Sequence, residues 1–131
     1  MKKPRILVVE DDRIIARSLR MILERLGYEV TALASTGQAA IREAEENKPD
    51  LILMDIVLDG AMDGIEAAKV IRSNAGIPLV YLTAHADHAT RERADATQPF
   101  GYLSKPIMRE DLRHIIEQAL SASQGECLKN G

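Results

Sequence analysis

The sequence has a single cysteine, little excess charge and no long apolar run, and each of these features excludes a class of protein. One cysteine, Cys127, cannot form an internal disulfide, so we expect a reducing, cytoplasmic environment. The 17 Lys and Arg against 20 Asp and Glu give a net charge of −3, unlike the basic surface of a nucleic-acid binder. No apolar run approaches the length of a membrane span, and we expect no secretory signal after Met1.

Apolar and charged residues make up 46% and 28% of the 131 residues, which is typical of one globular domain. Short apolar runs alternate with longer amphipathic runs, so the former predict strands and the latter helices. Strands are expected over 6–9, 28–34, 51–54, 79–82 and 100–103. Helices are expected over 14–26, 65–72, 87–97 and 110–120. A further helix is expected to begin at a cap, either Ser35 or Thr36, and to end before Pro49.

Five strands that alternate with five helices predict a (βα)5 α/β fold with a doubly wound, five-stranded parallel sheet. The near-continuous apolar strands fit a sheet that is buried on both faces. We expect residues 1–122 to form the domain and the polar residues 123–131 to form a mobile tail. Asp12, at the start of the first helix, is interpreted as its N-cap rather than as a ligand.

Polar side chains stand at the ends of four predicted strands. Glu10 and Asp11 follow the first strand, Asp55 the third, Thr83 the fourth and Lys105 the fifth. Ligands of open parallel α/β sheets bind beyond the carboxyl ends of the strands. With strand order 2-1-3-4-5, which is taken from known folds of this class, these groups would converge at one edge.

This convergence predicts a magnesium-assisted phosphoryl acceptor. Three crowded carboxylates repel one another, and a hard divalent cation with oxygen ligands relieves that repulsion. An Asp carboxylate can accept a phosphoryl group as an acyl phosphate, which makes Asp55 the candidate acceptor. Lys105 supplies a positive charge for a phosphoryl oxygen, and Thr83 supplies a hydroxyl donor.

Four stretches of the chain resemble the receiver domains of bacterial two-component response regulators. They are Ile6-Leu7-Val8-Val9-Glu10-Asp11-Asp12, Leu53-Met54-Asp55, Leu82-Thr83-Ala84 and Phe100-Gly101-Tyr102-Leu103-Ser104-Lys105-Pro106. Each motif is weak alone, but the set in this order is highly specific. The resemblance covers about residues 4 to 122 and implies a flavodoxin-like fold. It also implies that the protein is not an enzyme but a phosphoacceptor that assists its own phosphorylation and dephosphorylation.

The resemblance implies a role for each residue of the acidic site. Asp55 corresponds to the phosphorylated aspartate. Glu10 and Asp11 correspond to the pair that holds Mg²⁺ with Asp55, and the backbone carbonyl of Val57 to a further protein ligand. Lys105 corresponds to the phosphoryl-binding lysine.

The resemblance also implies a switch and its partners. Thr83 and Tyr102 correspond to the switch pair, and the Lys105–Pro106 bond is expected to be cis. The face of the fourth helix, fifth strand and fifth helix would relay the signal. The implied phosphodonor is a sensor histidine kinase or phosphotransfer protein, and the downstream partner is another protein rather than nucleic acid or membrane. Phosphorylation could also drive homodimer formation.

The loop after the acceptor departs from the family pattern. Asp59 stands where a proline is usual, and Asp63-Gly64 comes one residue late, so the stretch Asp59–Met62 is interpreted as a lengthened loop. The side chain of Val57 is apolar and cannot guide an attacking water. The lifetime of the phosphoryl group is therefore left open.

Two other functions compete with this interpretation. A phosphatase of the haloacid-dehalogenase kind also uses a strand-end aspartate, but it needs a second aspartate two residues later, where this chain has Val57. A degenerate receiver would act only as an interaction module, which the intact acidic pair and Lys105 disfavour. The charges at Arg91, Glu92, Arg93 and Asp95 are interpreted as a solvated helix face.

Overall fold

The sheet of the computed structural model has five parallel strands in the order β2-β1-β3-β4-β5, as expected for a doubly wound fold. The structure describes residues 3–58, 60–84 and 86–130, with side chains to Ala122. The strands are β1 (Arg5–Val9), β2 (Glu29–Ala34), β3 (Leu51–Asp55), β4 (Leu79–Thr83) and β5 (Gly101–Ser104). The helices are α1 (Arg13–Arg25), α2 (Gly37–Asn47), α3 (Gly64–Asn74), α4 (His88–Ala96) and α5 (Arg109–Asn130).

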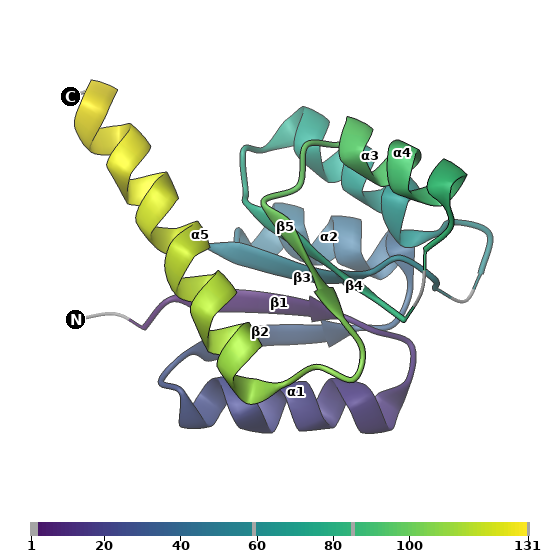
Figure 1. Ribbon diagram of the computed structural model, residues 1–131, viewed down its shortest axis with the longest axis horizontal. Helices are drawn as coiled ribbons and strands as arrows, with labels where there is room; N and C mark the ends of the chain where they lie inside the picture. The colour runs from purple at the N-terminus through teal and green to yellow at the C-terminus, as the bar shows by residue number, and fades with distance from the viewer. Residues whose placement is uncertain (1–2, 59, 85, 131) are drawn as a thin grey trace.

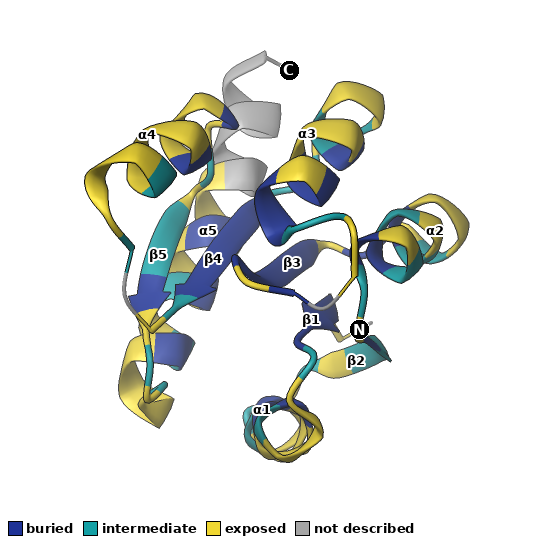
Figure 2. Ribbon diagram, turned by 90° about the vertical axis from the view of Figure 1, so that its right-hand side faces the viewer, coloured by how far each residue is buried: buried dark blue, intermediate teal, exposed yellow. Residues whose placement is uncertain are grey.

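Helices cover both faces of the sheet, with α1 and α5 on one side and α2, α3 and α4 on the other (Figures 1 and 2). Successive strand residues point to opposite faces, so each strand supplies both layers of the core. Ile6 and Val8 of β1 face α1 and α5, whereas Leu7 and Val9 face the opposite layer. This double burial accounts for the unbroken apolar runs of the sequence.

Side-chain caps fix where the helices begin, and therefore where the strand-to-helix loops end. The side chain of Asp12 accepts hydrogen bonds from the N–H groups of Ile14 and Ile15, which confirms its predicted role as an N-cap. Thr36 caps α2, and Asp63 forms a capping box with Glu66 at the start of α3. Each cap satisfies backbone donors that the first helical turn leaves unpaired.

Helix α5 is longer than expected, because it runs to Asn130 rather than ending near Leu120. Its apolar pattern ends at Ala119 and Leu120, where the helix leaves the core, but no proline follows to stop the backbone. The predicted mobile tail, residues 123–131, lies where the structure does not describe side chains, so its mobility stays a prediction. No helix of the described residues is long and apolar enough to cross a membrane.

The loop between β3 and α3, predicted to be lengthened over Asp59–Met62, contacts the start of α2 through Met62. Asp59 itself lies outside the described residues. Gly60 adopts a φ of 98°, a conformation that L side chains rarely take. The side chain of Met62 lies against Gly37 at the start of α2, where an added Cβ would come within 2.9 Å of it. The loop thus enters α3 along a path set by its neighbours.

Gly64 is required where α3 passes closest to the strand that carries Asp55. Its N–H donates to the carbonyl of Ile56 at 2.9 Å, and a Cβ there would lie 2.0 Å from the backbone oxygen of Asp55. Such a contact cannot be relieved by rotating a side chain, because the clashing atom belongs to the backbone.

We therefore expect Gly64→Ala to lower the free energy of unfolding by about 2 kcal/mol or more, as overpacked sites do. Gly76→Ala is the matched control, because a Cβ there meets nothing within 4 Å, and its effect should stay within about 0.5 kcal/mol. Urea denaturation measures both. Equal stability of the two variants would show that the close approach at Gly64 is unimportant.

Candidate functional site

The carboxyl ends of four adjacent strands form a cleft of about 270 Å³. Because β1, β3, β4 and β5 lie side by side, residues distant in the sequence meet at one edge of the sheet. The cleft is lined by Glu10, Asp11, Asp12, Ile15, Asp55, Ile56, Val57, Thr83, Ala84 and Lys105. The predicted acceptor, acidic pair, hydroxyl and lysine are therefore neighbours in the fold.

Lys105 is the bridge between the two most buried carboxylates of the cleft. Its Nζ lies 2.9 Å from Oδ2 of Asp55 and 2.7 Å from Oε1 of Glu10. The side chains of Glu10 and Asp55 are only 1% and 7% exposed, so this charge compensation occurs largely out of water. Paired buried charges of this kind are destabilised strongly when one partner is removed.

The electrostatics of the pair favour a charged lysine and oppose a charged Glu10. Burial raises the pKa of Glu10, and the nearby Asp55 carboxylate raises it further, while Lys105 lowers it. Burial lowers the pKa of Lys105, but its contacts with Glu10 and Asp55 outweigh burial and raise that pKa overall. Lys105 is the one basic residue among the described residues that line the cleft, where it lies with Glu10, Asp11 and Asp55.

The acidic side chains are placed to share a cation. One carboxylate oxygen each from Glu10, Asp11 and Asp55 lies within 4.8 Å of the others. The buried Oε1 of Glu10 touches the ammonium group of Lys105, yet no donor is aligned with it for a hydrogen bond. Oxygen donors with this surplus of negative charge fit a hard divalent cation such as Mg²⁺.

The backbone around the acceptor contributes further contacts. Oδ1 of Asp55 accepts a hydrogen bond of 3.2 Å from the N–H of Val57, so both carboxylate oxygens have partners. Val57 also lines the cleft, and the residue is 72% exposed. Thr83 is another lining residue, and its carbonyl accepts a hydrogen bond from the N–H of Lys105. The Lys105–Pro106 bond is cis, as expected.

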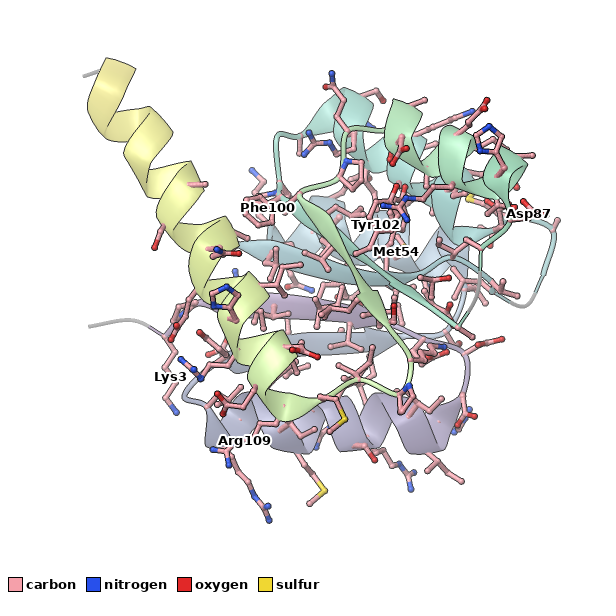
Figure 3. The ribbon with its side chains drawn as sticks, in the orientation of Figure 1. Lys3, Met54, Asp87, Phe100, Tyr102 and Arg109 are labelled. Atoms are coloured by element: carbon pink, nitrogen blue, oxygen red, sulfur yellow. The ribbon has the colours of Figure 1, made fainter. Side chains whose placement is uncertain are left out.

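Tyr102 does not enter the cleft but reaches α4 from β5 (Figure 3). Its hydroxyl donates to Oδ1 of Asp95 at 2.5 Å, and the guanidinium of Arg91 lies 3.7 Å above its ring. Burial, followed by the hydrogen bond to Asp95, raises the pKa of Tyr102 to about 12. The phenol therefore keeps its proton at physiological pH and donates it as a hydrogen bond to Asp95.

The charged residues Arg91, Glu92, Arg93 and Asp95 of α4 are exposed, as expected for a solvated helix face, but three of them also make contacts within the domain. Arg91 and Asp95 hold Tyr102, and Arg93 donates to Asp63 in the loop before α3 at 3.1 Å. The sequence carried one signal of this, because Arg91 and Asp95 are four residues apart and so share a helix face. Their target on β5 had no such signal.

The chain matches the family model described as the response regulator receiver domain over residues 6–117. It is 40% identical over 117 residues to the transcriptional regulatory protein PdtaR of Mycobacterium tuberculosis, covering 89% of this chain and 57% of that protein. The chain thus spans little more than half of such curated relatives.

Solved structures agree with this match. The signal receiver domain of a modulated diguanylate cyclase from Desulfovibrio desulfuricans G20 superposes with a TM-score of 0.91 at 39% identity, covering 95% of this chain and 99% of that one. The receiver domain of the sensor histidine kinase PA1611 from Pseudomonas aeruginosa, solved with a magnesium ion in its active-site cleft, gives 0.83 at 33% identity. That alignment covers 92% of this chain and 99% of the other.

Removal of the lysine should leave two buried carboxylates without compensation. We expect Lys105→Met to lower the free energy of unfolding of the metal-free protein by roughly 3 kcal/mol. Lys69→Met, at an exposed position of α3, is the control and should change it by less than about 0.5 kcal/mol. Denaturation in the presence of a chelator measures both, and indistinguishable variants would mean that Lys105 carries no structural charge compensation.

Proposed function

The chain belongs to the response regulator receiver family, and from that premise we propose that it is a signalling switch in which Asp55 accepts a phosphoryl group. The observation that carries the proposal is the position of the Lys105 ammonium group, 2.9 Å from the Asp55 carboxylate in a cleft that also holds Glu10 and Asp11. The donor would be a histidine kinase or a phosphotransfer protein in the cytoplasm.

In the proposed transfer, a carboxylate oxygen of Asp55 forms a bond to phosphorus as the bond from phosphorus to the donor imidazole breaks. The electron pair of that bond stays with the imidazole nitrogen, which takes up a proton. Lys105 would exchange its contact with Asp55 for one with a phosphoryl oxygen, so its charge stays compensated. The hydroxyl of Thr83, which also lines the cleft, would donate to another phosphoryl oxygen.

Glu10, Asp11, Asp55 and the carbonyl of Val57 are proposed to hold Mg²⁺. When bound, the ion would neutralise negative charge on the acceptor and on the incoming group. The clustered carboxylate oxygens of this chain support the assignment, as does the magnesium ion in the cleft of the PA1611 receiver. Hydrolysis of the acyl phosphate would return the carboxylate and release phosphate, without steady turnover of another substrate.

The signal is proposed to leave through the face formed by α4, β5 and α5. Thr83 ends β4 beside Ser104 of β5, and Tyr102 on β5 contacts α4. A displacement of Thr83 in the cleft would therefore reach α4 through the neighbouring strand β5. Residues 1–122 would form the receiver unit, and the face would meet a downstream protein or a second copy of the chain. The regulatory activities named for the longer relatives are properties of those proteins and are not assigned to this chain.

Asp55→Asn should abolish phosphoryl uptake from acetyl phosphate with Mg²⁺, because an amide cannot form the acyl phosphate. Labelling with radioactive acetyl phosphate, or the mass shift of the intact protein, measures the reaction. Asp111→Asn, at an exposed position of α5, is the matched control and should be labelled like the unmodified protein. Undiminished labelling of the Asp55 variant would refute the assignment.

Asp11→Asn should weaken Mg²⁺ binding by about tenfold or more, because an anionic oxygen donor is lost. Asp12→Asn is the neighbouring control: asparagine caps a helix as well as aspartate does, so Mg²⁺ affinity should be nearly unchanged. Titration calorimetry measures both affinities. If the unmodified protein itself binds no Mg²⁺, the chain is better described as an interaction module.

A further inference from the structure

Helix α4 is attached to the domain mainly by polar contacts. Ala94 is its one buried residue among those described, and most of the helix surface is exposed (Figure 2). By contrast, α3 buries Gly64, Ile65, Ala67, Ala68 and Ile71. A helix with so little apolar burial depends on side-chain hydrogen bonds for its position, so those bonds decide where it sits.

Two of these contacts fix α4 relative to the sheet and to the acceptor loop. Beyond its C-terminal end, the buried hydroxyl of Thr97 lies 2.7 Å from the Tyr81 hydroxyl of β4. On the side that faces α3, Arg93 donates to Asp63, the residue that caps α3. These anchors place the intervening residue Asp95 above β5.

Asp95 completes a closed cluster with Arg91 and Tyr102. Its Oδ1 accepts from the Tyr102 hydroxyl at 2.5 Å and from Nε of Arg91 at 3.4 Å, while the Arg91 guanidinium stacks on the ring of Tyr102. A tyrosine restrained at both its hydroxyl and its ring face cannot turn without breaking its contacts with both Asp95 and Arg91.

The strand register places Tyr102 next to the cleft as well as next to α4. Tyr102 pairs with Tyr81 on β4, with their ring centroids 5.7 Å apart, and Thr83 is two residues further along the same face of β4. A move of Tyr102 toward Thr83 would take its hydroxyl away from Asp95. The hydroxyl cannot occupy both places at once.

We propose that Asp95, supported by Arg91, is a positioning residue that latches Tyr102 to α4 and so opposes the phosphoryl-bound state. The inference rests on the proposed function, because the latch matters only if a phosphoryl group at Asp55 favours another position of Tyr102. A ligand that binds only when Tyr102 is released from Asp95 has an apparent Kd equal to its intrinsic Kd divided by the fraction of molecules in that released state. Loss of the latch should therefore tighten binding of a phosphoryl mimic.

The test is the affinity for beryllium fluoride in the presence of Mg²⁺, measured by amide NMR titration. Asp95→Ala should bind the mimic about three- to tenfold more tightly than the unmodified protein, because one charge-assisted hydrogen bond at a partly exposed site is lost. Alanine keeps the helix propensity of α4 high. Glu92→Ala is the matched control on the same helix: its partner is the exposed His88, and its affinity should change by less than about twofold.

A double-mutant cycle separates the latch from a general loosening of α4. In a Tyr102→Phe background the hydrogen bond is already absent, so Asp95→Ala should then alter the affinity by less than about twofold. An unchanged or weaker affinity of Asp95→Ala alone, or an equal gain in both backgrounds, would overturn the proposed latch. Failure of the unmodified protein to bind the mimic would instead overturn the proposed function.

Discussion

One lysine between two buried carboxylates organises the molecule's functional edge. Lys105 lies 2.7 Å from Glu10 and 2.9 Å from Asp55, and these residues stand at the carboxyl ends of three different strands. Without a cation the carboxylates would repel one another in a largely dry cleft. The parallel sheet brings the three groups together, and the close packing of Gly64 against the backbone of Asp55 keeps the β3 end in place. The fold and the charge balance therefore depend on each other.

The contacts of Lys105 with Glu10 and Asp55 make the site sensitive to a change of charge at Asp55. Burial and the Asp55 carboxylate raise the pKa of Glu10 even though Lys105 lies beside it. Because Lys105 is in direct contact with Asp55, the proposed phosphoryl group on Asp55 would alter that contact. Helix α4 and its C-cap Thr97 are held by polar contacts with Tyr81, Tyr102 and Asp63, which is why we place the proposed output of the switch at this helix.

Much of this architecture could be predicted from the sequence, because its signals are local. Apolar runs bounded by polar residues located the strands, Asp12 was recognisable as a cap, and Thr36 was one of the two candidates for the cap of α2. The polar residues at strand ends identified the candidate site, although the roles of Asp55, Thr83 and Tyr102 stay predictions. The strand order itself came from known folds.

Other features depend on side chains that meet across the fold and have no local signal. The hydrogen bond between Asp95 and Tyr102 joins α4 to β5, and the contact of Met62 with Gly37 joins a loop to α2. Neither pair is linked by sequence spacing that a helix or strand period would reveal. The length of α5 was missed for another reason: its apolar pattern ends at Leu120, although its backbone remains helical to Asn130.

The most direct test of the central claim is a crystal structure of the protein with Mg²⁺ and beryllium fluoride. The account predicts beryllium bound to a carboxylate oxygen of Asp55, Lys105 in contact with a fluorine, and Mg²⁺ ligated by Asp11. A structure in which Lys105 still joins Glu10 to Asp55, with neither ion in the cleft under saturating conditions, would contradict it.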